Sequence, residues 1–218
     1  MSSGLKLFFH PLSSFCHKVL IALYENNTLF EPVVVDLGSA DSSAEMRRLW
    51  PIAKFPLLRD DARNQTVPES SIIIEYLAQH YPGPSTLIGK NEDFARDTRL
   101  KDRFYDLHVQ VPMQKIVGDR IRPQDQRDPL GVSQARAALK TALDIAEKDL
   151  AGKTWVMGDM FTMADCAAAP ALFYANLVLP YADTHKTVTA YFERLKQRPS
   201  YARVLKEAEP FMQYFPRD

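Results

Sequence analysis

The chain has 218 residues, of which 46% are hydrophobic and 25% are charged, so it can bury a sizeable core in one or two domains. Its 27 lysines and arginines balance its 27 aspartates and glutamates, which leaves no net charge to attract nucleic acid or an anionic membrane surface. The longest apolar runs, such as residues 71–74 and 167–172, are far shorter than the roughly 20 residues that a membrane-spanning helix needs. We therefore expect neither nucleic-acid nor membrane partners.

The cysteines and histidines bear on the location of the protein and on whether it binds a metal ion. The two cysteines, Cys16 and Cys166, fall in what look like different domains, and no charged-then-apolar leader precedes the first predicted strand. A reducing, cytoplasmic location suits such a chain. His10 and His17 have no histidine, cysteine or carboxylate partner at ligand spacing, so no metal site is expected.

The first 82 residues alternate between strand and helix patterns, which predicts a domain with parallel strand pairing. The predicted elements are a strand at 5–9, a helix at 14–26, a strand at 30–35, a short helix at 42–49, a hairpin with strands at 54–59 and 65–67, and a helix at 71–81. This βαβαββα order, with Pro56 entering the third strand, is the thioredoxin-type arrangement. Phe55–Pro56 is the candidate for a cis peptide bond.

A break rich in proline and glycine separates this domain from a helical remainder. Residues 83–90 form the predicted linker and 91–218 the second, all-α domain. Its predicted helices span 92–120 with an interruption at Pro112, then 130–150, a third that opens at 161–166, and shorter ones near 188–197 and 200–208. Thr162 and Asp165 form a capping box at the third helix, which we place at the centre of the domain because it is mostly small and apolar.

Ser13 and Ser14 lie on the predicted turn between the first strand and the first helix, where a redox protein on the same plan would keep its attacking cysteine. Such a turn directs backbone N–H groups and the positive end of a helix dipole at its occupant, which favours a thiolate or another anion. Either serine could instead act only as the helix N-cap, or one turn could serve both purposes. Cys16 stands at the resolving position of a Cys-x-x-Cys motif, but a lone cysteine facing a helix core is usually inert.

Three motifs, in this order and spacing, resemble those of the cytosolic glutathione transferases, and the resemblance covers essentially the whole chain. Residues 13–16 resemble the active-site turn of the serine-type classes, theta, zeta and their bacterial relatives. Residues 51–57, Pro-Ile-Ala-Lys-Phe-Pro-Leu, are similar to the family's Asn-Pro-x-Gly-Lys-Val-Pro-x-Leu, and residues 68–70 match its Glu/Gln-Ser pair. Each motif is short, so the set rather than any single member carries the resemblance.

The second motif departs from the family pattern at three positions, where Trp50 replaces asparagine, Ala53 replaces glycine and Phe55 replaces valine. Phe55 keeps the backbone groups that would pair with glutathione. Ala53, in contrast, lacks glycine's freedom at positive φ. These changes bear on glutathione affinity more than on the fold.

The resemblance implies an α/β thioredoxin-like N-terminal domain, an all-α C-terminal domain, and an enzyme with glutathione as co-substrate. The Ser13 hydroxyl, with Ser14 beside it, would donate a hydrogen bond to the glutathione thiolate instead of attacking. The residues implied to bind glutathione are Lys54, Phe55, Pro56, Glu69 and Ser70, and those expected to line a pocket for a hydrophobic electrophile are Leu12, Tyr105, His108, Pro112 and Met113. An aromatic and methionine face at helical spacing also suits a core. A cytoplasmic homodimer acting in detoxification is usual for the family.

Two other kinds of function stay open at this point. The same activated thiolate could serve a glutathione-dependent isomerase, disulfide reductase or ether-cleaving enzyme, and the Ser13-x-x-Cys16 spacing slightly favours disulfide exchange. A non-catalytic protein that binds glutathione or another ligand is slightly favoured by the departures around Lys54.

Overall fold

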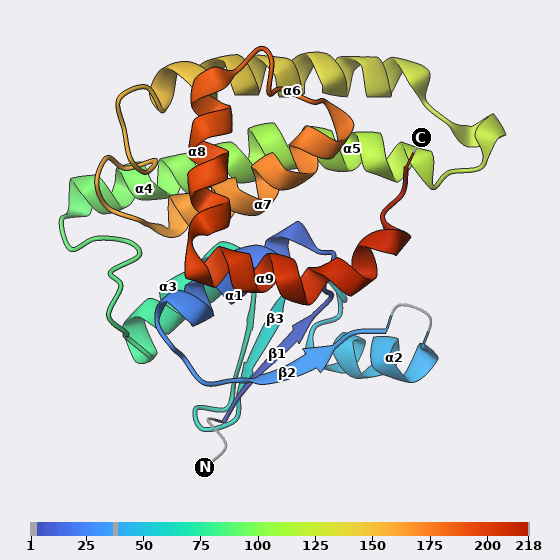
Figure 1. Cartoon of the computed structure of the whole chain (residues 1–218). Helices are drawn as coiled ribbons and strands as arrows, with labels where there is room; N and C mark the ends of the chain where they lie inside the picture. The colour runs from blue at the N-terminus through green and yellow to red at the C-terminus, as the bar shows by residue number, and fades with distance from the viewer. Residues whose placement is uncertain (1–3, 37–38, 218) are drawn as a thin grey trace.

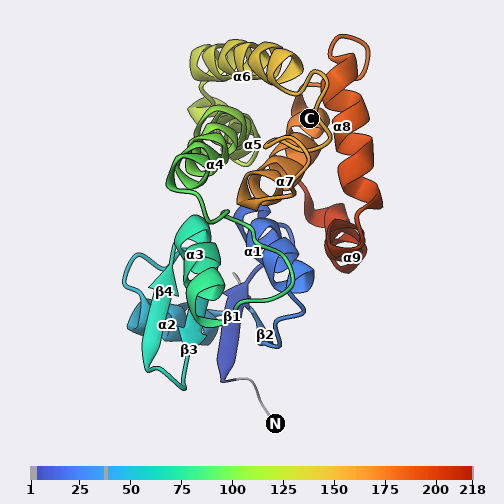
Figure 2. The same ribbon diagram turned by 90° about the vertical axis from the view of Figure 1, so that its left-hand side faces the viewer.

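The N-terminal domain is built on a four-stranded mixed sheet. The computed structural model describes residues 4–36 and 39–217. The strand order is β2-β1-β3-β4, in which β1 and β2 are parallel and the β1–β3 and β3–β4 pairs are antiparallel. The elements are β1 (Leu5–Phe9), α1 (Ser14–Glu25), β2 (Glu31–Val34), α2 (Ala40–Leu49), β3 (Leu57–Asp60), β4 (Gln65–Pro68) and α3 (Ser70–His80), as Figures 1 and 2 show. The predicted βαβαββα, thioredoxin-like order is confirmed.

Alternating side chains of β1 divide the core between the two faces of the sheet, as the period of two in a strand requires. Leu5, Leu7 and Phe9 are buried in the main core together with residues of α1 and α3. Phe8 belongs to a smaller cluster with Met46 of α2. In Figure 2, α1 and α3 lie between the sheet and the helical domain, so the N-terminal end of α1 reaches the domain boundary.

The C-terminal domain is helical. Its elements are α4 (Glu92–Phe104), η1 (Tyr105–Gln110), α5 (Val111–Arg120), η2 (Gln124–Gln126), α6 (Pro129–Asp149), α7 (Met163–Val178), α8 (Lys186–Gln197), α9 (Pro199–Ala208) and η3 (Glu209–Tyr214). Figures 1 and 2 show α7 surrounded by the other long helices and lying above α1. The third helix is therefore central, as its small apolar residues predicted.

The predicted interruption at Pro112 takes the form of a wide, π-helical turn. This turn, η1, precedes the proline, and α4, η1 and α5 follow one another without a break in helical structure. Because proline has no N–H group, it cannot close the hydrogen bond of a regular turn behind it, and a wider turn accommodates the loss. The extra residue also shifts which side chains face the core after Phe104.

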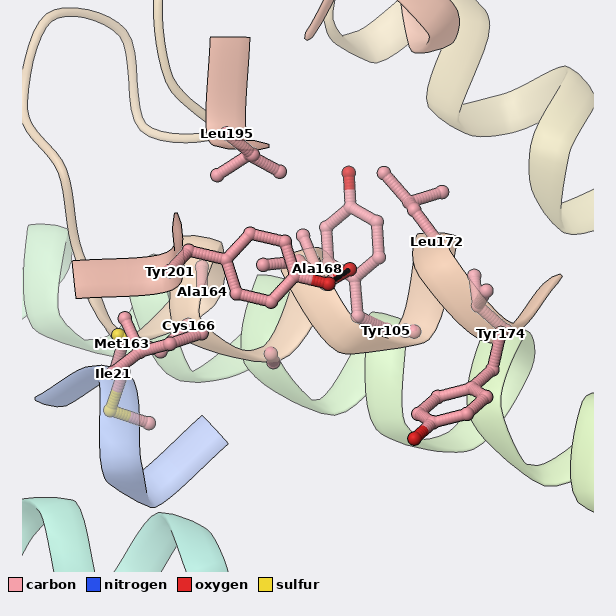
Figure 3. Packing of buried hydrophobic residues seen from close by; sticks show 14 of the residues in the cluster. Ile21, Tyr105, Met163, Ala164, Cys166, Ala168, Leu172, Tyr174, Leu195 and Tyr201 are labelled. Atoms are coloured by element: carbon pink, nitrogen blue, oxygen red, sulfur yellow. Dashed lines mark hydrogen bonds between the residues drawn. The ribbon is translucent and has the colours of Figure 1, made fainter. Parts of the chain in front are cut away.

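The start of α7 is held by the capping box that the sequence predicts. The Asp165 carboxylate accepts the Thr162 N–H (2.8 Å), and it also accepts the Val156 N–H (2.8 Å) and the Tyr191 hydroxyl (2.7 Å). Figure 3 shows the core around α7, in which Ile21 of α1 packs with residues of the helical domain. One continuous core therefore spans both domains and fixes their relative position.

Between α3 and α4, residues 81–91 cross from one domain to the other in bends. This stretch includes the predicted linker, 83–90, whereas the outer limits of the predicted domains, residues 1 and 218, lie outside the described residues. Within the described parts of the chain, no helix is both long enough and apolar enough to span a membrane.

Candidate functional site

Ser13 caps α1. Its backbone is extended (φ −82°, ψ 118°), and its Oγ accepts the Cys16 N–H at 3.3 Å. A hydroxyl that accepts one hydrogen bond still has its own proton to donate. Ser14 is the first helical residue and is only 5% exposed. Of the two serines, Ser13 is thus the more accessible, and it lies at the positive end of the helix dipole.

A cavity of about 390 Å³ adjoins both serines at the domain boundary. It is mostly apolar, and part of its wall comes from the C-terminal segment, where Phe215 stacks on Tyr174 with 5.5 Å between the ring centroids. The Tyr174 hydroxyl donates to the Leu12 carbonyl oxygen at 2.8 Å, and Arg120 holds the Pro216 carbonyl oxygen at 3.1 Å. The ring contact with Tyr174 and the hydrogen bond from Arg120 hold the segment in the wall of the cavity.

A second cavity, of about 350 Å³, is lined by every residue that we expect from the sequence to bind glutathione, namely Lys54, Phe55, Pro56, Glu69 and Ser70. Phe55 and Gln114 line both cavities. The two cavities are therefore adjacent, and a ligand in the second would lie next to a ligand in the first, beside Ser13.

Three unusual backbone features lie at or next to the second cavity. The predicted cis peptide bond at Phe55–Pro56 is present, and Ala53 adopts the positive φ (53°) that the family pattern assigns to glycine. Glu69, at the start of α3, has φ 70°, which is uncommon for a residue with a side chain and costs about 1–3 kcal/mol. Strain of this kind clusters at functional sites.

Beside this cavity lies a charged network that sequence reasoning did not find. Lys18 of α1 is 1% exposed, and its Nζ contacts Asp102 Oδ1 (2.6 Å), Asp106 Oδ2 (2.8 Å) and Ser71 Oγ (2.7 Å). Arg103 joins Asp102 at 2.8 Å. Burial raises the pKa of Asp106, an effect that Lys18 opposes. The one sequence feature that could have indicated this network is Lys18 itself, a lysine among the apolar residues of α1.

Arg103 and Asp106 also line the second cavity, which therefore offers two cations and two carboxylates. Lys54 and Arg103 are the cations, Glu69 and Asp106 the carboxylates. Glutathione carries two carboxylates and one ammonium group, so the charges available in the cavity suit it.

The residues expected around the electrophile divide into two groups. Leu12 and Met113 line the first cavity. Tyr105, His108 and Pro112 do not: Tyr105 is buried in the core (Figure 3), and His108 is exposed. The expected face assumed a 3.6-residue period up to the interruption at Pro112, whereas the π-helical turn of η1 already begins at Tyr105.

The cavity residues that sequence reasoning missed come mainly from distant parts of the chain. They are His10, Gln110, Gln114, Val117, Gly118, Tyr174, Phe215 and Pro216. No local pattern indicates that the C-terminal segment folds back onto the first turn of α1. His10 was noted only as a metal ligand without partners.

Cys16 is fully buried, and burial raises the pKa of its thiol to about 12. A thiol of that pKa supplies essentially no thiolate at neutral pH, which removes the main requirement for redox chemistry at this position. Among residues 4–36 and 39–217, no three histidine, cysteine or carboxylate side chains gather where they could hold a metal ion.

Comparisons with known proteins agree with this geometry. Residues 7–85 match the glutathione S-transferase N-terminal domain, and residues 119–206 match the glutathione S-transferase C-terminal domain. A glutathione S-transferase-like protein, LUC7, of a Fusarium species is 33% identical over 182 residues, which cover 81% of each chain. A stringent starvation protein A homolog of Haemophilus influenzae is 26% identical over 210 residues, covering 95% of this chain and 93% of that protein.

The solved structures include a glutathione S-transferase from Methylobacterium radiotolerans in complex with glutathione sulfonate. It superimposes with a TM-score of 0.80 at 26% identity and covers 92% of this chain and 93% of its own. The two matched domains, the Fusarium relative and the fold together lead to one conclusion: the chain belongs to the glutathione S-transferase family.

Proposed function

We propose that this protein is a serine-type glutathione transferase, in which the Ser13 hydroxyl stabilises the glutathione thiolate for attack on a hydrophobic electrophile. The observation that carries the proposal is the pair of cavities that meet at Phe55 and Gln114, one charged and one apolar, with Ser13 at the apolar side. The family membership and the glutathione derivative bound by the Methylobacterium protein support the same substrate.

Glutathione binds in the charged cavity by matching charges. Lys54, Arg103 and the Ser70 hydroxyl suit its carboxylates, and Glu69 suits its ammonium group. The cis bond before Pro56 leaves the Phe55 backbone to pair with the peptide part of glutathione. The positive φ of Ala53 supports this placement, because the turn keeps its form without glycine.

A free thiol with a pKa near 8.5 is only a few per cent thiolate at pH 7. The Ser13 proton and the N-terminus of α1 both favour the charged form of a sulfur placed beside them. A hydrogen bond to a charged group contributes about 1.5–3 kcal/mol, which corresponds to a pKa shift of about one to two units. Such a shift would make a large share of bound glutathione reactive.

The apolar cavity of about 390 Å³ suits a small hydrophobic electrophile held next to the sulfur. Disulfide exchange through Cys16 has less support, because its buried thiol stays protonated. The buried, unpaired state of both cysteines is in keeping with a cytoplasmic protein.

We also propose a homodimer. Leu100, Leu107 and Val111 are 63%, 52% and 47% exposed and follow one another at intervals of seven and four residues along α4, η1 and α5. Ile72 of α3 is 52% exposed, and α3 is tied to α4 by the Arg99–Glu75 ion pair (2.8 Å). Apolar side chains exposed together in this way suit a two-fold, isologous contact.

Retention on immobilised glutathione, followed by the rate of conjugation to benzyl chloride, tests the proposed activity. We expect Ser13→Ala to bind glutathione within a few-fold of the wild type and to lower kcat/KM about 10- to 100-fold. Ser13→Thr, which keeps both the hydroxyl and the cap, should retain most of the rate. Full activity in Ser13→Ala would exclude Ser13 as the activating residue, and a larger loss in Ser14→Ala would transfer the role to Ser14.

A further inference from the structure

His10 follows β1 directly and lines the apolar cavity together with Ser13. Its ring stacks on Phe55, with 5.8 Å between centroids and 24° between planes, and meets Phe211 edge-on at 6.4 Å. Two aromatic neighbours therefore hold the imidazole in one orientation at the boundary between the two cavities.

The ring proton of His10 has a defined position. The Leu12 N–H donates to His10 Nδ1 at 3.2 Å, so Nδ1 must carry a lone pair. In a neutral imidazole, the proton is then on Nε2. Burial lowers the pKa of His10, against the opposing effect of Asp36, so the ring is neutral at pH 7. His10, a lining residue of the cavity, thus carries its single N–H donor on Nε2.

A second polar side chain lines the same cavity from the helical domain. Gln110 is 2% exposed, and its amide oxygen has no hydrogen-bond partner among the described residues. Buried polar groups in an otherwise apolar pocket usually serve to orient a polar ligand. A purely hydrocarbon electrophile would leave the Nε2–H of His10 without an acceptor. A carbonyl oxygen supplies that acceptor, whereas the Gln110 oxygen needs a donor and makes no bond to it.

We propose that His10 is a catalytic residue whose Nε2–H donates a hydrogen bond to the carbonyl oxygen of an α,β-unsaturated carbonyl electrophile, so that this cavity selects such compounds. The inference rests on the proposed function, since it needs a glutathione thiolate beside Ser13. It adds a second donor, His10, which acts on the electrophile and sets the preference of this cavity.

The step conserves atoms and electrons. The thiolate sulfur forms a bond to the β-carbon, the C=C electron pair becomes the new bond between the α-carbon and the carbonyl carbon, and the carbonyl pair moves onto oxygen. The Nε2–H of His10 donates to this enolate oxygen and keeps its proton. The α-carbon then takes a proton from water, which replaces the proton that glutathione released on forming the thiolate. A donor placed where charge develops accelerates such a step.

Two electrophiles with the same phenyl group separate this role from simple packing. In 4-phenylbut-3-en-2-one, a carbonyl is conjugated to the attacked carbon, whereas benzyl chloride has no oxygen. His10→Asn keeps an acceptor for the Leu12 N–H but lacks the Nε2–H, and His10→Phe keeps the ring that stacks on Phe55. We expect both to lower kcat/KM for the enone about 10- to 100-fold and for benzyl chloride less than threefold, a range below the loss of a full oxyanion donor.

His10→Gln, whose amide nitrogen reaches toward the place of Nε2, should restore part of the enone rate. His80→Phe, at the C-terminal end of α3 and outside both cavities, is the control for histidine loss and should leave both rates unchanged. Equal losses on the two electrophiles in His10→Asn would show that His10 is only a wall, and an unchanged enone rate would overturn the proposal outright.

A binding measurement keeps the inference separate from the proposed function. Nuclear magnetic resonance titration compares 4-phenylbutan-2-one, which has the carbonyl, with butylbenzene, which does not; neither needs glutathione. We expect His10→Asn to weaken the ketone about 3- to 10-fold, the effect of one neutral hydrogen bond, and to leave butylbenzene unchanged. Equal affinities of wild type and variant for the ketone would refute the role of His10. Absence of glutathione binding and of benzyl chloride turnover in the wild type would instead refute the proposed function.

Discussion

At the scale of single residues, Ser13 caps a helix and is the proposed donor to a thiolate, two roles that a sequence cannot separate. Its oxygen caps α1 through the Cys16 N–H, and its proton remains to be donated to a ligand in the cavity. Ser14 fits the same N-cap pattern in sequence, but it is the first helical residue and is buried. Only the backbone conformation decides which of two adjacent serines is the cap and which is inside the helix.

His17, on the same helix, gives the protein a specific response to acid. It is 1% exposed, its Nε2–H donates to the Pro11 carbonyl oxygen, and burial lowers its pKa to about 4. The unfolded chain has the ordinary value of about 6.5 and therefore binds more protons between pH 6.5 and pH 4. The free energy of unfolding must fall as the pH falls through this interval.

Between pH 7.5 and pH 5.0, this residue alone should account for a loss of about 2 kcal/mol. His17→Gln keeps a donor for the Pro11 carbonyl oxygen but cannot be protonated, so its free energy of unfolding should fall by about that much less over the same interval. Denaturant unfolding of both proteins at the two pH values measures the difference. Parallel losses would mean that His17 is not neutral in the folded state.

At the scale of elements, buried charges join α1 to α4 and η1. Lys18 of α1 is enclosed by Asp102 and Asp106, while Arg103 lies at the solvent-facing rim. Removing the lysine leaves two buried carboxylates with one partly exposed cation, and breaking a buried ion pair in this way usually costs more than the pair contributed.

We therefore expect Lys18→Met to lower the free energy of unfolding by about 3–5 kcal/mol. The matched control is Lys140→Met on α6, which removes a lysine that is 64% exposed and paired with Asp144 at 2.8 Å. An exposed pair of this kind contributes less than about 1 kcal/mol. Chemical denaturation of the two variants compares the effects, and similar losses would contradict the structural role of the Lys18 network.

Much of the element order follows from the sequence, because the spacing of apolar residues and the residues that end helices and strands are local features of the chain. The alternation of strand and helix over the first domain and the box at Thr162 and Asp165 are confirmed. The phase of side chains after Phe104 could not be predicted, since a wide turn before a proline has no distinct pattern. For the same reason, Tyr105 was expected at the pocket although it packs in the core.

The candidate site was predictable only where motifs mark it. The residues assigned to glutathione, from Lys54 to Ser70, lie around one cavity, and the cis bond at Phe55–Pro56 is present. Phe215 and Arg103 could not be found, because each reaches its cavity through tertiary packing rather than through its neighbours in sequence.

At the scale of the whole molecule, one core crosses the domain boundary and both cavities open along it. Ile21 of α1 and Cys166 of α7 belong to the same buried cluster, so the two domains cannot move independently without exposing it. The wall at Ser13 and the wall at Met113 are thereby held at a fixed separation, as a reaction between two bound molecules requires.

The exposed apolar side chains of α3, α4, η1 and α5 predict the assembly. We expect the wild type to elute as a dimer in size-exclusion chromatography with light scattering and Leu100→Glu to shift it to a monomer, because each subunit would bring a charge into the contact. Leu29→Glu, at a residue 73% exposed between α1 and β2, is the control and should leave the dimer intact. A monomeric wild type would refute the assembly.

In the function proposed for this protein, Ser13 stabilises a thiolate that belongs to bound glutathione. The most direct measurement is a pH titration of the ultraviolet absorbance of the thiolate in the complex with wild type, Ser13→Thr and Ser13→Ala. We predict a thiol pKa one to two units below the free value of about 8.5 in the wild type and Ser13→Thr, and a return toward that value in Ser13→Ala. Equal pKa values in wild type and Ser13→Ala would contradict it.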